Sequence, residues 1–197
     1  GSWSYTEELD IKSSRELIHT LVDIVSKNGN LLLNISPRSD GSIPLEQRHS
    51  LLGVGDWLKL NGEAIYETRP FRIYGEGPKR MESSGHFVQM NGEYSAENIR
   101  FTTRDNSLYV IQMGWLGSHK EFTVNCLNHD NLANTQIKEI SVIGSDESIE
   151  WKISDEGLKI RTPFKAPNES AVVFKIDTND LGLIVLEDQA EAVAPIT

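Results

Sequence analysis

Apolar residues near the start of the chain recur every three or four positions, which predicts an amphipathic helix. Ser13 and Glu16 stand at the spacing of a capping box, in which the serine hydroxyl accepts from the third helical amide and the glutamate reaches back to the capping amide. The helix is expected to end at Lys27, Asn28 and Gly29. Its apolar face consists of Leu17, Ile18, Leu21, Val22, Ile24 and Val25. The pattern therefore predicts a core-packing helix.

The next apolar segment is continuous rather than periodic. Leu31 to Leu33 form an unbroken apolar run, and such a run predicts a strand over 31–35 that is covered on both faces, as in a parallel sheet or barrel. Pro44 lies in the first turn of a second predicted helix, which ends at Asn61 and Gly62. The inward-facing residues of this helix are expected to be Leu51, Leu52, Val54, Trp57, Leu58 and Leu60. This helix-strand-helix order is typical of an α/β unit.

Past Pro78 the apolar period changes from about 3.6 to 2. Turn signals separate the alternating segments at Arg104-Asp105-Asn106, at His129-Asp130-Asn131 and at Asp155-Glu156-Gly157. The alternating sets are Phe101 and Thr103; Leu108 and Val110; Tyr109, Ile111 and Met113; Phe122 and Val124; Ile140 and Val142; Ile149, Trp151 and Ile153; Leu158 and Ile160; Val172, Phe174 and Ile176. Short strands at this spacing predict a compact antiparallel β-sandwich.

The last segment, residues 177–197, carries five acidic residues and neither Lys nor Arg. An apolar patch at Leu181 to Leu186 is long enough to add a strand, whereas 187–197 reads as a solvated tail or a linker.

Charge and cysteine content narrow the possible functions. The 197 residues carry a net charge of −10, which argues against nucleic acid as a partner because phosphate binding requires clustered Lys and Arg, but leaves neutral glycans open. Cys126 is the single cysteine, so an intrachain disulfide is impossible and we expect a small buried hydrophobic residue there. The sequence contains no apolar stretch of the roughly 20 residues that a membrane-spanning helix needs.

Several motifs are similar to one glycoside hydrolase family. The continuous run from Asn28 to Pro70 resembles the end of the catalytic barrel in the α-L-fucosidases of glycoside hydrolase family 29, and Ser2-Trp3-Ser4-Tyr5 resembles the family's Ser-Trp-Gly-Tyr segment. The resemblance extends to about Ile176. The motifs of the second zone that carry it are Asn98-Ile99-Arg100-Phe101-Thr102, Leu108-Tyr109 leading to Gly114-Trp115, and Gly157-Leu158-Lys159-Ile160.

The resemblance implies a fold and a division of the chain. The expected fold class is α/β followed by β, namely the C-terminal part of a (β/α)8-type barrel and then an antiparallel β-sandwich domain. Residues 1–78 are the predicted barrel segment, 79–176 the C-terminal sandwich and 177–197 an acidic tail or linker. We further expect the apolar faces of the first segment to be buried only against strands and helices that precede it in the family.

The resemblance also assigns the chemistry. In this family the nucleophile is an Asp and the acid/base a Glu, and both precede the Ser-Trp-Gly-Tyr segment, so no catalytic residue is assigned to this chain. The aromatic residue of that segment lines the fucose pocket, which makes Trp3 the predicted substrate-binding residue; an indole suits the apolar face of a 6-deoxy sugar. The alternative is that Trp3 only packs the loop. Ser4 and Ser36 stand where the family usually has Gly.

Topology sorts the remaining polar residues, because the active site of a barrel lies at the C-terminal ends of its strands. Asn34, the loop Ser36 to Ser42, Trp3 and Tyr5 are expected on that face, whereas Glu63 follows a helix that returns to the opposite face and is interpreted as structural. The acidic residues Glu7, Glu8 and Asp10 read as a solvated loop, and Asp40 as a turn residue. The histidines at 19, 49, 86, 119 and 129 show no metal-ligand spacing and are expected mostly on helix or turn surfaces. No metal or cofactor is predicted.

The leading hypothesis is therefore the C-terminal portion of a retaining exo-α-L-fucosidase, with both catalytic carboxylates upstream of this chain. Its expected partners are the N-terminal remainder of the catalytic barrel and a fucosylated glycan, and neither nucleic acid nor a membrane span is expected. The family implies a secreted, periplasmic or lysosomal location. The alternative is a non-catalytic carbohydrate-binding or structural β-sandwich module, which gives no reason for a helix-strand-helix unit at the start.

Overall fold

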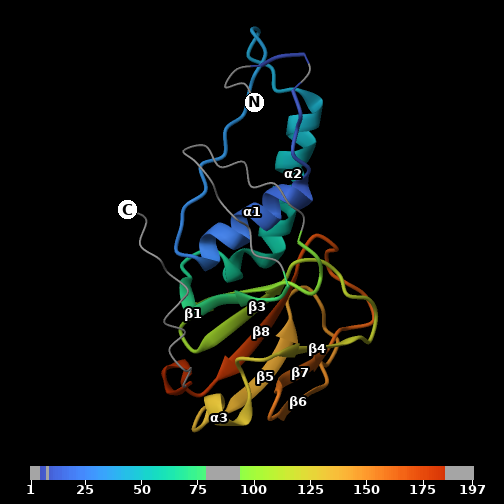
Figure 1. The fold of residues 1–197 in the computed structure, drawn as a ribbon. Coiled ribbons are helices and arrows are strands. Elements are labelled where there is room, and N and C mark those ends of the chain that lie inside the picture. Colours follow the sequence, from blue (N-terminus) through green and yellow to red (C-terminus); the bar gives the residue numbers. More distant parts are fainter. Residues whose placement is uncertain (1–4, 8, 79–93, 185–197) are drawn as a thin grey trace.

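The computed structural model describes residues 5–7, 9–78 and 94–184 of the chain. Two helices, α1 (Ser14–Ser26) and α2 (Leu45–Asn61), are on one side of a five-stranded sheet, and a three-stranded sheet lies against the other face (Figure 1). α1 lies across the sheet, whereas α2 reaches it with its C-terminal end. The molecule thus has a helical layer and two sheet layers. The helical layer comes from the predicted barrel segment, and the two sheets form the sandwich.

The first helix forms as its capping signals predict. The Ser13 hydroxyl accepts from the Glu16 amide at 3.2 Å, and the Ser13 amide donates to the Glu16 carboxylate at 2.7 Å. The hydrogen bond from the Ser13 amide is the main reason why the pKa of Glu16 is lowered. After Ser26 the chain turns away at Asn28, whose φ of 65° ends the helix.

The predicted strand over 31–35 does not form, and this prediction is wrong. Residues 31–35 pair with no other strand among the described residues, and Leu32 is 94% exposed. A parallel strand takes its backbone hydrogen bonds and its two covering layers from neighbouring strands and helices. The described parts of this chain contain no strand that runs beside it, so the apolar run stays extended and exposed.

The second helix, α2, begins after Pro44 and ends before the 3-10 turn η1 (Gly62–Ala64), close to its predicted limits. Gly53 lies where the two helices cross, because a Cβ there would stand 2.2 Å from the Ser14 hydroxyl oxygen. Of the predicted inward face, Trp57 is fully buried, whereas Leu52 is 53% exposed and Leu60 is 38% exposed. The helix therefore buries a narrower stripe than the sequence suggests.

The sandwich agrees with the predicted alternation. The larger sheet has the order β1-β2-β3-β8-β5 and the smaller one β4-β7-β6, and all pairs are antiparallel. The strands are β1 (Arg69–Glu76), β2 (Ile99–Arg104), β3 (Ser107–Gln112), β4 (Glu121–Val124), β5 (Ile137–Val142), β6 (Trp151–Ser154), β7 (Gly157–Arg161) and β8 (Val172–Thr178). Between the sheets lies a core that includes Phe101, Val110, Leu158, Ile160 and Phe174.

Two of the three predicted turns join adjacent strands, Arg104-Asp105-Asn106 between β2 and β3 and Asp155-Glu156-Gly157 between β6 and β7. The third, His129-Asp130-Asn131, lies instead in the short helix α3 (His129–Leu132), which is capped by the Asn128 side chain. The strand β1 was not predicted, although Phe71 and Ile73 alternate in it. Pro70 is tolerated there because β1 is an edge strand.

The helical layer rests on the outer face of the larger sheet. Ile18, Val22 and Trp57 pack against this face, and the Trp57 indole Nε1 donates to the Ala171 carbonyl at 3.0 Å. The sheet side of this second core consists of Tyr109, Ile111, Met113 and Val173. The expectation that these helices bury their apolar faces only against preceding barrel elements is therefore wrong. Tyr109 and Ile111 reach the helices because alternate residues of β3 point away from the sandwich interior.

Candidate functional site

The loop after the exposed leucines is a tight hydrogen-bonded turn. The Arg38 amide donates to the Ser42 carbonyl at 2.9 Å, the Gly41 amide donates to the Arg38 carbonyl at 2.9 Å, and Gly41 has a φ of 83°. The Asp40 carboxylate accepts from the Ser42 amide at 2.9 Å, and its hydrogen bonds to Ser42 lower the pKa of Asp40. Asp40 is thus a turn residue, as predicted.

This loop is attached to α2 through a residue that the sequence analysis missed. The Gln47 side chain accepts from the Ser36 amide at 2.9 Å and donates to the Ser36 carbonyl at 3.2 Å, and both residues are buried. The signal available in the sequence was a glutamine in the first turn of the helix that follows the loop. A side-chain amide in that position can satisfy both backbone groups of one residue.

The structure brings together the two loops that topology placed on one face. The Arg38 guanidinium lies 5.3 Å from the centroid of the Tyr5 ring, within the range of a cation–π contact. The Ser50 hydroxyl donates to the Lys12 carbonyl at 2.7 Å, so the segment before α1 is also tied to α2. Trp3, the predicted substrate-binding residue, lies outside the described residues, and its role stays a prediction.

The acidic residues expected near this face are on the surface where the structure describes them. Glu7 and Asp10 are exposed, as is Asn34, and Glu8 lies outside the described residues. Glu63 lies in η1, just past the C-terminal end of α2. At 1.5 Å per residue, that end is about 25 Å from the N-terminal end, which follows the loop Ser36 to Ser42. The Glu63 carboxylate lies 3.9 Å from the Lys175 ammonium of β8. This position agrees with the structural interpretation of Glu63.

The histidines and the cysteine have separate environments. His19 is buried rather than on a surface, because it lies on the face of α1 that meets the sheet; its Nε2 is 2.7 Å from the Ser170 carbonyl oxygen. His129 is exposed and pairs with Asp155 at 3.0 Å, whereas His86 lies outside the described residues. Among the described residues no three His, Cys, Asp or Glu side chains group as metal ligands. Cys126 is buried, as predicted, and its burial raises the pKa of the thiol.

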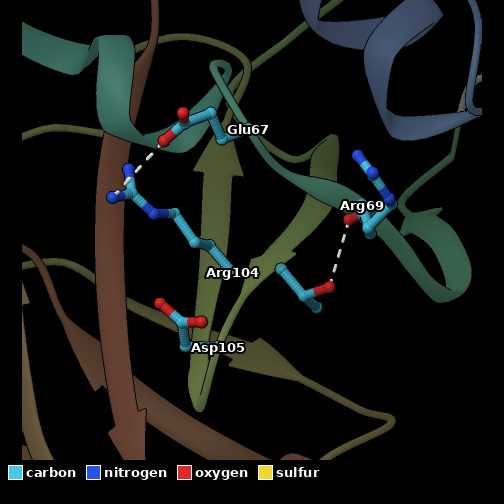
Figure 2. A pocket seen from close by; sticks show the side chains of 5 residues that line it. Glu67, Arg69, Arg104 and Asp105 are labelled. Carbon is cyan, nitrogen blue, oxygen red and sulfur yellow. Dashed lines mark hydrogen bonds and ion pairs between the residues drawn. The ribbon is translucent and has the colours of Figure 1, made fainter.

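A surface hollow lies at one end of the larger sheet, between β1 and the β2–β3 turn (Figure 2). It is lined by Glu67, Arg69, Thr103, Arg104 and Asp105. Arg104 reaches toward Glu67 at 3.6 Å, while Arg69 extends away from this pair. Sugar and cofactor sites are concave and mostly apolar. This hollow is open and lined mainly by charged side chains, and it lies on the sandwich sheet.

Comparison with known proteins relates both parts of the chain to one family. Residues 1–63 match the family Alpha-L-fucosidase, and residues 92–177 match the Alpha-L-fucosidase C-terminal domain. Human tissue alpha-L-fucosidase is 30% identical over 171 residues, which are 85% of this chain and 32% of that protein. Human plasma alpha-L-fucosidase is 31% identical over 166 residues, 82% of this chain and 31% of that protein.

Solved structures lead to the same family. The Thermotoga maritima alpha-fucosidase in complex with fucose is 29% identical and superposes with a TM-score of 0.68 over 89% of this chain and 37% of that protein. The chain spans about a third of the length of these relatives. No helix in the described part of the chain is long and apolar enough to cross a membrane. The chain belongs to the α-L-fucosidase family of glycoside hydrolases and comprises the C-terminal part of the catalytic barrel followed by the C-terminal β-sandwich.

Proposed function

We propose that the chain is the C-terminal portion of a retaining exo-α-L-fucosidase that removes terminal α-L-fucose from glycans. In the proposed mechanism an Asp attacks the anomeric carbon to form a fucosyl-enzyme intermediate. A Glu protonates the departing oxygen and later activates the water that releases fucose. Both carboxylates belong to the part of the barrel that precedes this chain. The support is the match of both parts of the chain to α-L-fucosidases.

The observation that carries this proposal is an apolar surface on the barrel-derived segment that no described residue covers. It consists of Leu32, Leu33, Ile35, Ile43, Leu45, Leu52 and Leu60, each between 37% and 94% exposed. Several exposed large apolar side chains on one segment indicate an interaction site. Its proposed occupant is the N-terminal remainder of the catalytic barrel, which covers the exposed apolar side chains of residues 31–35. A free-standing sugar-binding module would leave this surface without a purpose.

The chain contributes a wall of the fucose site and a scaffold. The wall is formed by the segment before α1, with Trp3 and Tyr5, and by the loop Ser36 to Ser42. The contact between Tyr5 and Arg38 and the clamp of Ser36 by Gln47 support a common, preformed face. For the chain as a whole we propose a barrel segment at 1–78, a sandwich at 79–176 and a tail or linker at 177–197. Within the first range β1 (Arg69–Glu76) is an exception, because it pairs with β2 in the sandwich sheet.

The first test is the activity of the purified chain on an aryl α-L-fucoside. The chain alone is expected to be inactive, because both carboxylates of the two-step mechanism lie outside it. The assembly with the complete barrel is expected to hydrolyse the fucoside. Turnover that stays with the 197-residue chain through repeated purification would overturn the assignment of the catalytic roles. Cleavage of another glycoside in place of the fucoside would overturn the substrate class.

A second test concerns Trp3 in the complete barrel. Replacing Trp3 by Ala removes an apolar platform worth roughly 1.5 to 3 kcal/mol when fully buried. The loss is expected in KM if the contact is equal in the ground and transition states, and also in kcat if it tightens in the transition state. Trp3→Phe, which keeps an aromatic ring, is the matched control and should lose less. Unchanged kinetics and unchanged inhibition by fucose in Trp3→Ala would place Trp3 outside the pocket.

A further inference from the structure

A buried cluster of charged and polar side chains joins α1 to the sandwich. One carboxylate oxygen of Asp23 accepts from the Arg100 Nε at 2.7 Å and from the Tyr94 hydroxyl at 2.8 Å. The other accepts from the Lys27 ammonium at 2.7 Å. Asp23 is in the last turns of α1, Arg100 is on β2 and Tyr94 precedes β2, so the carboxylate connects two layers of the fold. Asp23 and Arg100 are each only 1% exposed.

The sheet side of the cluster is shaped to hold the arginine. The Arg100 guanidinium lies between two rings, 4.6 Å from the centroid of Tyr94 and 5.3 Å from that of Tyr74. Gly75 of the neighbouring strand leaves it room, because a Cβ there would stand 2.9 Å from the Arg100 Nη1. The Nη1 group donates to the Ile99 carbonyl at 2.9 Å, whereas Nη2 has no hydrogen-bond partner among the described residues.

This arrangement is poorly suited to adding net stability. The Coulomb attraction within a buried ion pair roughly offsets the free energy that its desolvation costs. Replacing such a pair by apolar residues of similar volume often leaves stability unchanged or raises it. The unpartnered Nη2 adds a further cost, because a buried donor without an acceptor is unfavourable. Instead, the cluster fixes the orientation of α1, since its hydrogen bonds can form only when the helix lies in one position on the sheet.

The apolar contacts around the cluster cannot provide that direction. Ile18 and Val22 meet the sheet through non-directional packing, which a helix rotated or shifted on the same surface could largely replace. A second polar contact of α1 within the described residues is also directional: the His19 Nε2 lies 2.7 Å from the carbonyl oxygen of Ser170, which precedes β8. Asp23 lies one helical turn further along and contacts β2. Directional contacts at two separate places on the sandwich fix the direction of the helix axis, whereas a single contact would let the helix turn about it.

We propose that Asp23, Tyr94 and Arg100 are positioning residues that set the orientation of α1 on the sandwich and, through α1, the segment 5–13 that leads into it. The part of this inference that concerns the segment 5–13 rests on the proposed function, because that segment carries one wall of the fucose site. The sandwich then has a role in the enzyme beyond packing: it holds the last part of the barrel at one angle.

The first experiment uses the 197-residue chain and does not depend on activity. Asp23→Leu, Tyr94→Phe and Arg100→Met are combined, so that no partner of the cluster is left buried and unpaired. Asp56→Leu with Lys59→Met, which removes an ion pair of exposed side chains on α2, is the matched control. The readouts are the denaturation midpoint and the hydrogen-exchange rates of amides in α1, β3 and β8.

The triple variant is expected to keep its denaturation midpoint and its protection in β3 and β8, while amides of α1 exchange faster by on the order of tenfold or more. The control variant should keep both the wild-type denaturation midpoint and the wild-type exchange rates in α1, β3 and β8. A triple variant with wild-type protection in α1 would overturn the proposal, since the helix would then be held equally well without the cluster. A large loss of global stability would also overturn it, because the cluster would then act as a stabiliser.

The second experiment uses the complete barrel and measures kcat and KM for an aryl α-L-fucoside at a temperature well below unfolding. The triple variant is expected to raise KM several-fold with an unchanged unfolding temperature, because a misplaced segment 5–13 weakens substrate binding. Unchanged kcat and KM would contradict the proposal that the cluster positions the segment 5–13 at the sugar site. A wild-type assembly without fucosidase activity would contradict the proposed function alone, since the exchange experiment stands without it.

Discussion

The sandwich and the helical segment differ in where their apolar side chains find partners. In the sandwich, Phe174 is fully buried between two sheets that the same chain supplies. In the helical segment, Trp57 is equally buried on the outer face of the larger sheet, but Leu52 and Leu32 remain 53% and 94% exposed. Both regions are rich in large apolar residues. The difference shows that a side chain is buried only where a partner surface is within reach. For Leu52 and Leu32 no described residue provides such a surface.

The two regions also differ in where their backbone amides and carbonyls find hydrogen-bond partners. A helix satisfies its amides and carbonyls within itself, so α1 and α2 form without the barrel around them. A strand needs a neighbouring strand for its backbone hydrogen bonds, and within residues 5–7, 9–78 and 94–184 only the sandwich strands have one. Residues 31–35 share the composition of a buried strand but have no adjacent strand among the described residues. The burial of large apolar side chains therefore differs most between the sandwich core and the leucines of residues 31–35.

The largest expected contrast is between Phe174→Ala and Leu52→Ala in the 197-residue chain. Phe174→Ala removes a ring from the centre of the sandwich core and should lower the free energy of unfolding by about 3 to 5 kcal/mol. Leu52→Ala should stay within about 0.5 kcal/mol, because its side chain is mostly in water. Chemical denaturation of both variants measures the difference. A Leu52→Ala cost close to that of Phe174→Ala would mean that this face of α2 is covered in solution.

The next prediction concerns the ion pair of Asp23 and Arg100, which joins the helical segment to the sandwich. Burial alone would raise the pKa of Asp23, but the hydrogen bonds from Lys27 and Arg100 outweigh it, so the pKa of Asp23 is lowered from its ordinary value. The stability that the carboxylate contributes is therefore present above about pH 4, the ordinary pKa of Asp, and is lost as the pH falls through the lower value of the folded state. Asp23→Asn leaves Arg100 without its counter-charge and should cost about 3 to 5 kcal/mol at pH 7.

The measurement is the free energy of unfolding of the wild type and of Asp23→Asn between pH 2 and pH 7. The difference between them should be largest at pH 5 to 7 and should shrink below pH 4. Asp56→Asn is the control, because Asp56 and Lys59 are exposed and such pairs contribute little. A difference between wild type and Asp23→Asn that stays constant with pH would contradict the charged state assigned to Asp23.

The smallest expected effect is local to the helical segment. Ser13→Ala removes the capping hydroxyl of α1 and should cost about 1 kcal/mol. Ser13→Thr keeps the hydroxyl and should lie close to the wild type. Thermal unfolding and hydrogen exchange in the first turn of α1 measure both variants. A Ser13→Ala cost near zero would mean that packing on the sheet, rather than the cap, determines where α1 begins.

Local signals in the sequence were sufficient for much of the fold. The capping box at Ser13 and Glu16, the end of α1 near Asn28 and the alternation along β2, β3 and β8 were all correct. β1 was missed because the strand pattern was expected to begin only past Pro78, whereas β1 lies at Arg69–Glu76. At the candidate site, Asp40 was correctly placed in a turn, but Gln47 was missed because its partner Ser36 lies eleven residues away.

The sequence by itself determined the elements whose hydrogen bonds are local and the sandwich strands in which alternate residues share a face. It also carried the family resemblance that both matches support. Only the tertiary structure decided that α1 and α2 rest on the sandwich, that His19 and Asp23 are buried there, and that Leu32 is exposed. The reason is that periodicity tells which residues of an element share a face, whereas the surface that covers that face comes from distant parts of the chain or from outside it.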